Sequence, residues 1–284
     1  MSSPKTVLIT GCSDGGIGPA LAKEFQSRGC HVFATARNPA KMESLRDVPN
    51  VTLLPLDVSS PESISAAVAA ISAQTGGTLD YLINNAGALY VTPVLDFDMQ
   101  KAKALFDVNV WGVAAVTQAF SPLLISTKGC VVNISSLASI MYAPYYGIYA
   151  ASKAALNSIS ETLRLELQPF DVRVVTVISG AVESKVFQNG PPLQLPENSF
   201  YTPAQKEIAE RAAGKDTEKV TPVKVGDYAR TLVGDILGGA HGKVYRGRSA
   251  TLVSFLSGWM PTFLFDWISK LDTGLEKIEK PKQQ

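Results

Sequence analysis

A tyrosine and a lysine four residues apart, Tyr149 and Lys153, are the pair in this sequence best suited to chemistry. The Ala-rich stretch around them favours a helix, which places residues four apart on one face. A phenol with a reference pKa of about 10 is a proton donor at neutral pH. A neighbouring ammonium stabilises the phenolate and lowers that pKa, so the pair could move a proton onto or off an alkoxide. Because the chain holds nine tyrosines, the spacing alone decides little.

A glycine-rich turn lies near the start of the chain, from Thr10 to Gly18. It follows a short apolar run and precedes a segment with helical periodicity. Glycines let backbone N–H groups and a helix N-terminus approach a pyrophosphate, because a Cβ would push the phosphates away. A turn of this kind between a first strand and a first helix predicts a dinucleotide site.

Polar residues follow two later apolar runs. Asn84-Asn85-Ala86-Gly87 comes after one of them, and Asn133-Ile134-Ser135-Ser136 spans the end of the other. Ser136 precedes Tyr149 by thirteen residues. The carboxyl ends of parallel strands meet at one edge of a sheet, where nucleotides bind in doubly wound folds. We therefore expect these polar residues to lie beside the glycine-rich turn.

Apolar runs alternate with helical patterns along most of the chain. Strands are expected at Lys5–Thr10, His31–Thr35, Val51–Leu56, Leu79–Asn84, Cys130–Ile134, Val172–Val177 and Lys243–Tyr245. Helices are expected at Ile17–Arg28, Pro61–Gln74, Met99–Ser126, Gly147–Gln168 and Val225–Leu237. The alternation predicts an α/β fold, a doubly wound (Rossmann) parallel sheet with helices on both faces. We expect one catalytic domain over residues 1–248, followed by an apolar helical extension and charged tail over 249–284.

Composition narrows the function classes. The 284 residues carry a net charge of +1, which argues against a nucleic-acid binder held by phosphate contacts. The three cysteines and two histidines lack metal-ligand spacing, so no metal site is expected. The first apolar run, Val7 to Ile9, is far too short for a signal-peptide core, and no stretch reaches the roughly 18 apolar residues of a membrane-spanning helix. The expected location is cytoplasmic.

Taken in order, the motifs resemble those of the short-chain dehydrogenases/reductases, and the resemblance covers nearly the whole chain. That family carries Thr-Gly-x3-Gly-x-Gly, then Asn-Asn-Ala-Gly, an Asn in its fourth helix, a Ser, and Tyr-x-x-x-Lys. The matching residues are Thr10, Gly11, Gly16, Gly18, Asn84 to Gly87, Asn109, Ser136, Tyr149 and Lys153. Several motifs in one order are far more specific than any of them alone. The resemblance implies an oxidoreductase that uses a nicotinamide cofactor.

The resemblance also implies a role for four residues. Tyr149 would protonate the oxygen of a ketone as hydride arrives from the nicotinamide. Lys153 would lower the pKa of that phenol and bind the ribose hydroxyls, and Ser136 would polarise the carbonyl. Asn109 would hold a water that links Lys153 to solvent. From the residues alone, Ser136 could also be an ordinary strand-end hydroxyl beside Ser135, and Asn109 could cap a kink in its helix.

Cofactor contacts are assigned by the same resemblance. They are Gly11, Ser13, Gly16, Ile17, Gly18, Arg37, Asp57, Val58, Asn85, Ala86, Gly87, Tyr149, Lys153, Gly180, Val182 and Ser184. The chain departs from the family pattern in two places. Four residues separate Gly11 from Gly16, where the family usually has three. The family's Pro-Gly after the sixth strand is Ser179-Gly180 here, and Ser184 replaces the usual Thr.

The residue after the second strand decides the type of nicotinamide cofactor. An acidic residue there would bind the ribose 2′-hydroxyl of NAD. This chain has Arg37, which can pair with a 2′-phosphate, so NADPH is expected over NADH. The alternative is a solvated arginine. Asp57 and Val58 match the family's adenine-contacting pair, although Asp57 could instead cap the helix that follows.

The regular alternation stops after Val177. Residues 179–222 are rich in proline and contain one polar helical pattern near Gln205–Ala213. A long irregular insert in a compact domain is usually a lid or a binding loop. The insert is therefore expected to form the substrate loop, with a surface loop of no function as the alternative.

The last forty residues carry a second signal. No residue from Ala250 to Phe265 is charged, and an apolar stripe with i, i+3, i+4 spacing is interrupted by Gly258 and Pro261. The stripe comprises Leu252, Phe255, Leu256, Trp259, Met260, Phe263, Leu264, Trp267 and Ile268. One interpretation is a helix pair packed over the substrate pocket or a partner subunit. The other is an interfacial anchor to a membrane or lipid droplet, where tryptophans suit the headgroup boundary.

Within the family, three further stretches resemble the fungal NADPH-dependent reductases of 1-acyldihydroxyacetone phosphate. They are Val244 to Gly247, Ile148 to Lys153 and Glu166 to Phe170. The resemblance implies reduction of that ketone to 1-acylglycerol 3-phosphate. A fungal secondary-metabolism ketoreductase or a steroid-type dehydrogenase would use the same catalytic residues. The non-enzyme alternative is an NADPH-sensing scaffold.

The expected partners follow from these inferences. The substrate is expected to be a small lipophilic ketone, and no nucleic acid is expected to bind. The family commonly pairs the helices Met99–Ser126 and Gly147–Gln168 of two subunits, which implies a homodimer or homotetramer. The apolar tail adds contact with the endoplasmic reticulum or a lipid droplet, as a peripheral protein, to the expected locations.

Overall fold

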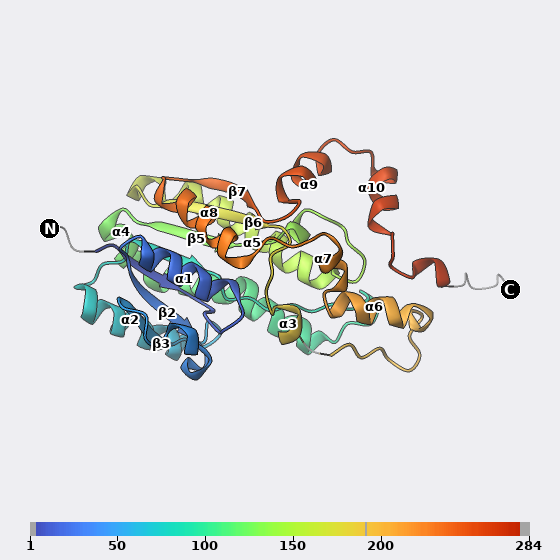
Figure 1. Ribbon diagram of the computed structural model, residues 1–284, viewed down its shortest axis with the longest axis horizontal. Helices are drawn as coiled ribbons and strands as arrows, with labels where there is room; N and C mark the ends of the chain where they lie inside the picture. The colour runs from blue at the N-terminus through green and yellow to red at the C-terminus, as the bar shows by residue number, and fades with distance from the viewer. Residues whose placement is uncertain (1–3, 191, 279–284) are drawn as a thin grey trace.

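A seven-stranded sheet forms the centre of the protein, in the strand order β3-β2-β1-β4-β5-β6-β7 (Figure 1). The computed structural model describes residues 4–190 and 192–278. The strands are β1 (Thr6–Ile9), β2 (His31–Ala36), β3 (Val51–Pro55), β4 (Tyr81–Asn84), β5 (Cys130–Ile134), β6 (Arg173–Ser179) and β7 (Gly242–Arg246). All neighbouring strands run parallel. The predicted doubly wound fold is confirmed.

Helices connect the strands and cover both faces of the sheet. The helices of the described residues are α1 (Ile17–Ser27), α2 (Pro61–Thr75), α3 (Met99–Phe106), α4 (Val113–Thr127), α5 (Gly147–Glu166), α6 (Gln205–Ala212), α7 (Lys215–Lys219), α8 (Val225–Leu237), α9 (Ala250–Ser257) and α10 (Thr262–Ser269). Short 3-10 turns lie at Pro39–Lys41, Glu43–Leu45, Leu137–Ser139, Gln168–Phe170, Phe187–Asn189, Thr202–Ala204 and Leu275–Lys277. The predicted cap of α2 is confirmed, since Ser60 accepts a hydrogen bond from the Ser63 N–H at 3.1 Å.

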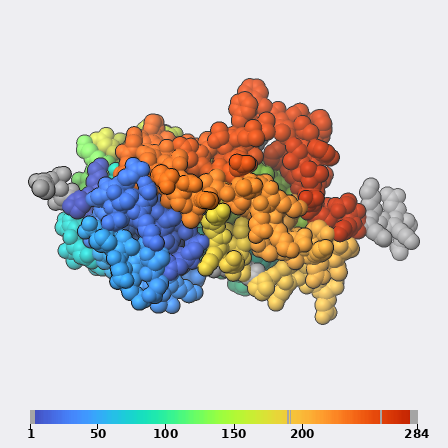
Figure 2. Space-filling view, viewed as in Figure 1, coloured from blue at the N-terminus to red at the C-terminus, as the bar shows by residue number. Residues whose placement is uncertain are grey.

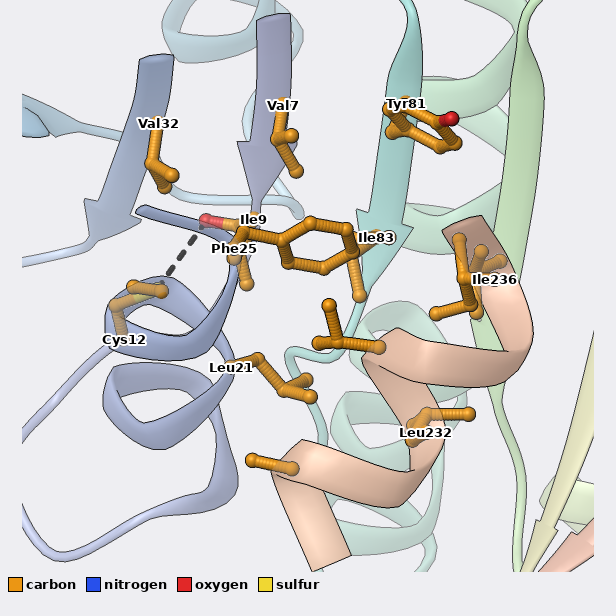
Figure 3. Packing of buried hydrophobic residues seen from close by; sticks show 14 of the residues in the cluster. Val7, Ile9, Cys12, Leu21, Phe25, Val32, Tyr81, Ile83, Leu232 and Ile236 are labelled. Atoms are coloured by element: carbon orange, nitrogen blue, oxygen red, sulfur yellow. Dashed lines mark hydrogen bonds between the residues drawn. The ribbon is translucent and has the colours of Figure 1, made fainter. Parts of the chain in front are cut away.

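Side chains alternate between the two faces along each strand, so each strand contributes to two cores. Val7 and Ile9 of β1 point to the face covered by α1 and α8, where Figure 3 shows Phe25 beside Ile9 and where Leu232 belongs to the same buried cluster. Leu8 points to the opposite face, which α2 and α4 cover. Strands buried on both faces account for the nearly continuous apolar runs in the sequence.

The strand order places the predicted motifs together. β1 pairs with β2 on one side and with β4 on the other, so the sheet is extended in opposite directions from this point. The turn after β1 and the Asn84–Gly87 motif after β4 therefore lie side by side at the carboxyl edge. In doubly wound folds the crevice at such a switch point binds the cofactor.

The helical stretch expected at Met99–Ser126 is not uniform. It contains a π-helical segment, Asp107–Gly112, between α3 and α4. Single π-helical turns inside α-helices are frequent at functional sites, and this one carries Asn109. From Met99 to Thr127 the stretch is long and apolar enough to cross a membrane, but half of its most apolar window is buried in the protein. A core helix of a soluble protein meets the same criteria.

The insert and the C-terminal region form a second, irregular layer beyond the carboxyl edge. The insert contains the expected helix, α6, and a second one, α7, which the sequence did not predict. The helices α9 and α10 follow β7 and project from the body, seen in red in Figures 1 and 2.

After α10 the chain returns to the insert. The Tyr145 hydroxyl donates to the Thr273 carbonyl at 2.8 Å, and the Arg211 guanidinium donates to the Leu271 carbonyl at 3.1 Å. Lys277 pairs with a carboxylate of α6 at 2.6 Å. The apolar helices are therefore attached to the body at both ends.

Candidate active site

The first two turns of α5 carry Tyr149 and Lys153 on one face, as the spacing predicts. The side chain of Lys153 is buried, and its Nζ donates to the Ile134 carbonyl at the end of β5 at 2.9 Å. Burial lowers the pKa of this ammonium to about 8, since removal from water disfavours the charged form. The parallel sheet thus provides a carbonyl that fixes the lysine at the carboxyl edge.

The phenol of Tyr149 differs from expectation. Burial raises its pKa, and a hydrogen bond with Ser136 acts in the opposite direction but does not cancel the increase. The lowering predicted from Lys153 is not among the causes of this shift, and the ammonium donates to the Ile134 carbonyl. A phenol with a raised pKa remains protonated at neutral pH, which suits a proton donor.

Of the two serines after β5, Ser136 is the one that reaches the phenol. It begins the 3-10 turn Leu137–Ser139, and its Oγ accepts from the Ala138 N–H at 3.2 Å. The neighbouring Ser135 is buried, and its Oγ donates to the Lys153 backbone carbonyl at 3.4 Å. Ser135 therefore fastens α5 to β5, whereas Ser136 is positioned beside the reacting group.

Asn109 is fully buried in the π-helical segment and holds three groups in place. Its Oδ1 accepts from the Ala88 N–H at 2.8 Å, and its Nδ2 donates to the Ala88 carbonyl at 2.9 Å and to Ser152 Oγ at 3.0 Å. Ser152 in turn donates to the Tyr149 carbonyl at 2.7 Å. Asn109 thus ties the strand β4 exit to the catalytic helix, while its role in holding a water stays a prediction.

Gly87 lies where these groups converge. A Cβ on it would stand 3.5 Å from Asn109 Oδ1 and 3.6 Å from Lys153 Nζ. The two neighbouring predicted contacts are held by the glycine-rich turn. The Asn85 amide donates to the carbonyls of Thr10 and Gly11, each at 2.9 Å, and the Ala86 N–H donates to Thr10 Oγ1 at 3.0 Å. The Asn85 side chain therefore fixes the turn rather than pointing to a ligand.

The turn itself has the shape of a phosphate cradle. Gly11 has a φ of 74°, and a Cβ there would lie 2.7 Å from Ala86 Cα. A Cβ on Gly18 would lie 2.5 Å from the Gly11 carbonyl oxygen. Gly16 precedes α1 without any side-chain cap, so the first N–H groups of that helix are free to bind anionic oxygens. Ser13 and Ile17 are half-buried within the same turn.

The additional residue in this turn is accommodated by a contact with the segment after β2. The Asp14 N–H donates to the Lys41 carbonyl at 2.8 Å, and the Asp14 carboxylate accepts from Ser44 Oγ at 2.5 Å. Gly15 then reverses the chain with a φ of 83°. The insertion therefore bulges away from the helix N-terminus and leaves the cradle intact.

Arg37 and Asp57 lie at the ends of β2 and β3, on the side of the sheet where the ribose and adenine of a dinucleotide bind. Arg37 is exposed, and its charge contributes to a lowered pKa of Asp57, for which the hydrogen bond from the Ser59 hydroxyl at 2.7 Å is the main cause. Asp57 does not cap α2, because Ser60 does. Val58 is buried against α4 and the π-helical segment.

The segment after β6 approaches the turn from the other side. A Cβ on Gly180 would overlap the Arg248 carbonyl, so only glycine fits at this position. Val182 is buried and forms a bridge with Val223, and Ser184 is half-buried after it. These three predicted contacts therefore lie on one strand-like extension of β6.

Sequence reasoning missed several residues that shape the site. Lys185 is one, since its backbone N–H donates to the Gly15 carbonyl at 2.9 Å and its side chain covers that glycine. Tyr145 is another: it has a φ of 73°, a costly conformation for a bulky residue. Its carbonyl accepts from the Thr92 N–H at 2.8 Å. Nothing in local composition marks Tyr145, whereas a lysine five residues after Gly180 could have been noticed.

A buried polar network behind the sheet was also missed. Asn84 donates to Asn133 Oδ1 at 2.8 Å and to Thr117 Oγ1 at 3.0 Å. Asn133 donates to Ser160 Oγ at 2.8 Å. The network joins β4, β5, α4 and α5, which explains why polar residues end these otherwise apolar strands.

The arrangement fits a nicotinamide dinucleotide. The cradle after β1 and the N-terminus of α1 would hold its pyrophosphate, Arg37 and Asp57 would face its ribose and adenine, and Lys153 would reach the second ribose. No group of at least three metal-ligating side chains occurs in the described parts of the chain. The cradle and the Ser136–Tyr149–Lys153 edge together support nicotinamide chemistry.

Comparison with known proteins agrees with this geometry. A family model described as short chain dehydrogenase matches residues 5–192. A relative from Penicillium crustosum, short-chain dehydrogenase PC-15, is 51% identical over 260 residues, which are 92% of this chain and 94% of that protein. The NADPH-dependent 1-acyldihydroxyacetone phosphate reductase of Schizosaccharomyces pombe is 42% identical over 74% of this chain and 72% of its own.

A solved structure shares the fold over nearly the whole chain. The short chain dehydrogenase from Burkholderia cenocepacia J2315, in complex with NADP, superposes with a TM-score of 0.73 at 26% identity, covering 94% of this chain and 99% of its own. The fold, the family match and the relatives lead to one conclusion. The chain belongs to the short-chain dehydrogenases, oxidoreductases that interconvert CH–OH and C=O groups with a nicotinamide cofactor.

Proposed function

We propose that the protein uses NADPH to reduce a ketone on a lipophilic substrate to a secondary alcohol. The observation that carries the proposal is the convergence of Ser136, Tyr149 and Lys153 where β5 ends and α5 begins, next to the phosphate cradle. A proton donor beside a dinucleotide site is what carbonyl reduction requires.

NADPH supplies the hydride for this reaction. Side chains of the protein orient the substrate and deliver the proton. Ser136 donates a hydrogen bond to the substrate oxygen, and Tyr149 delivers a proton to it as negative charge develops. Lys153 binds the ribose and, once drawn from the Ile134 carbonyl, stabilises the phenolate that Tyr149 leaves behind. Asn109 keeps β4 and α5 in register while this occurs.

NADPH is proposed over NADH because of the charge at the ribose end. Arg37 is exposed at the end of β2, where an acidic residue would repel a 2′-phosphate. Two relatives support this choice: the Schizosaccharomyces pombe reductase is NADPH-dependent by name, and the Burkholderia cenocepacia structure holds NADP. Lys185, next to the glycine-rich turn, adds a second cation for the phosphates.

Two substrate classes have specific support. A 1-acyldihydroxyacetone phosphate, reduced to 1-acylglycerol 3-phosphate, is favoured by the relative that carries this activity in its name. A neutral, bulky ketone, such as a polycyclic or steroid-like one, is favoured by the surroundings of the phenol. Tyr149 packs against an apolar cluster built from Leu89, Val91, Tyr145, Tyr146, Ala204, Ile208 and neighbouring residues of the insert. We take the acyl phosphate as the first candidate.

Oxidation of NADPH tests both candidates. The purified protein is mixed with an acyldihydroxyacetone phosphate or with a panel of polycyclic ketones, and Tyr149→Phe serves as the control. Turnover on the acyl phosphate that disappears in Tyr149→Phe supports the first candidate. Turnover on the polycyclic ketones alone supports the second. Turnover that persists in Tyr149→Phe would contradict the proposed proton donor.

Replacement of one residue tests the choice of cofactor. Arg37→Ser removes the cation at the ribose end, so we expect KM for NADPH to rise at least tenfold while KM for NADH changes little. Lys41→Ser, which removes a cation a few residues further along the chain, is the matched control. Equal effects on both cofactors would contradict a role for Arg37 in 2′-phosphate binding.

Assembly into a homodimer or homotetramer is proposed from the outer faces of α4 and α5. A groove of about 270 Å³ between these helices is mostly apolar. Its lining includes Val113, Ala114, Leu124, Ile125, Ile159 and Leu163. A second copy packing α4 and α5 against this face would fill the groove. Light scattering of the purified protein measures the state directly, and a monomer at all concentrations would contradict the proposal.

A further inference from the structure

The helices α9 and α10 expose an unusual amount of apolar surface. Seven large apolar side chains on or between them are 38–81% exposed: Leu252, Phe255, Trp259, Phe263, Leu264, Trp267 and Ile268. We call them the apolar helix pair. The four aromatic residues alone expose roughly 500 Å², the size of the largest patches on ordinary monomers, which are often functional.

The apolar helix pair is attached to the body by its other face. Ala250 is buried at the start of α9, and the ring of Phe265 meets Tyr142 edge-on at 6.2 Å. Asp266, the one carboxylate between 249 and 270, is half-buried. The exposed residues of the pair therefore include no acidic group. The two helices project from the molecule (Figure 2).

Charge at the borders of this face distinguishes between possible occupants. Arg248 precedes α9 and Lys270 follows α10, both are exposed, and neither forms an ion pair within the described residues. A second copy docking symmetrically would bring its own cations to this border, which costs energy. Anionic phospholipid headgroups complement the cations, and the polar edges of two tryptophans suit the same depth.

We propose that the apolar helix pair docks the protein on an anionic phospholipid surface. The Phe and Leu side chains enter the acyl region, Trp259 and Trp267 lie at headgroup level, and Arg248 and Lys270 contact lipid phosphates. A peripheral position on a cytoplasmic membrane face or a lipid droplet is part of this proposal. The pair is short and carries no spanning length, so it lies in the interface.

The apolar helix pair contacts a loop next to the catalytic residues, so docking could deliver a lipophilic substrate. Tyr142, which contacts α10, belongs to the loop between Ser136 and the catalytic helix. A lipophilic ketone could thus pass from the lipid to the site without crossing water. Docking requires no particular substrate, and it can therefore fail or succeed independently of the proposed reaction.

Tryptophan fluorescence tests the docking in a direct way. The chain has three tryptophans, so Trp111→Phe leaves Trp259 and Trp267 of the apolar helix pair as the only ones. The full-length variant is mixed with vesicles of phosphatidylcholine containing about 30% phosphatidylserine. We expect a blue shift of the emission and quenching by brominated lipid. An unchanged spectrum would overturn the proposal.

Sedimentation with the same vesicles measures the affinity. Replacement of Phe255, Trp259, Phe263 and Trp267 by Ser should reduce the partition coefficient at least tenfold, with an unchanged circular dichroism spectrum. Phe170→Ser is the matched control, since Phe170 is 48% exposed and lies before β6, at the opposite edge of the sheet. Arg248→Ser with Lys270→Ser should remove the preference for anionic over neutral vesicles.

Two further outcomes would overturn the proposal. Equal partition of the wild type and the fourfold variant would mean that other surfaces bind the lipid. A larger assembly of the wild type than of the fourfold variant in light scattering without vesicles would mean that the pair joins copies of the chain.

Discussion

The carboxyl edge of the sheet around Ser136, Tyr149 and Lys153, called here the catalytic edge, buries polar side chains, whereas the apolar helix pair exposes apolar ones. At the catalytic edge Asn84, Asn109, Asn133 and Lys153 are buried. In the helix pair, by contrast, Trp259 and its aromatic neighbours are exposed. A buried polar group is unusual unless it is hydrogen-bonded, and a large exposed apolar patch is unusual unless something covers it.

The difference lies in whether the partner is inside the molecule. Each buried asparagine has a partner at 2.8–3.0 Å, so its cost of desolvation is offset within the fold. The exposed aromatics, by contrast, keep most of their surface in solvent. Replacing a residue should therefore damage the folded state at the catalytic edge and leave it unchanged in the helix pair.

The largest effect is expected for Asn109→Ala. The change leaves the N–H and carbonyl of Ala88 without their partner and removes the N–H that donates to the Ser152 hydroxyl, because these three groups share one amide. We expect the free energy of unfolding to fall by about 3 kcal/mol and kcat to fall roughly 100-fold. Urea unfolding and NADPH oxidation measure the two quantities.

The matched control is Asn157→Ala, on the outer part of the catalytic helix. Asn157 makes one hydrogen bond, to Ser139 Oγ at 2.7 Å, and its Oδ1 is buried without a partner among the residues described. This variant should lose less than about 1 kcal/mol. If both variants lost the same free energy of unfolding, the hydrogen bonds of Asn109 would not be the reason for the larger effect expected there.

An intermediate effect is expected from pH. Burial lowers the pKa of Lys153 to about 8, so the ammonium is present below that pH and is lost as pH rises through it. The raised pKa of Tyr149 keeps the phenol protonated in the same range. We expect kcat/KM for ketone reduction, which reports the free enzyme, to fall about tenfold per pH unit above pH 8.

Replacement of the lysine identifies the group responsible for this fall. Lys153→Arg carries a charge that does not titrate below pH 12, so its residual activity should lack the decline. A decline of the same shape in Lys153→Arg would assign the titration to another group. In that case burial of Lys153 would not set the pH dependence of activity.

The smallest effect is expected for Phe263→Ser in the helix pair. Phe263 is 76% exposed, so the free energy of unfolding should change by no more than about 0.5 kcal/mol. Phe120→Ala, at a fully buried position in the core between α4 and the sheet, should cost about 3–5 kcal/mol. A loss above about 2 kcal/mol for Phe263→Ser would show that the helix pair is part of the core.

The sequence was sufficient to predict the sheet, its parallel strands and the order of the motifs. Strands buried on both faces leave continuous apolar runs, and motifs such as Tyr149 with Lys153 have fixed spacing on a helix. The edge at which Ser136 and Gly87 meet follows from these facts, because parallel strands end on one side. Fold and family therefore depend on local patterns that a single sequence contains.

What could not be predicted depends on contacts between distant segments. The direction of the Tyr149 pKa shift depends on burial by the insert and on where Lys153 Nζ points, neither of which spacing determines. The π-helical segment at Asn109 and the positive φ of Tyr145 arise from tertiary packing. The α7 helix is too short to leave a periodic pattern.

The attachment of the C-terminal helices at both ends has a consequence for how the protein would be cut. The connector Gly258–Pro261 is exposed or half-buried, and such segments are preferred by proteases. Past the cut, the chain still holds to Tyr145 through Thr273, to Arg211 through Leu271 and to α6 through Lys277. A protein nicked there should run as two pieces on a denaturing gel yet elute as one in its native state.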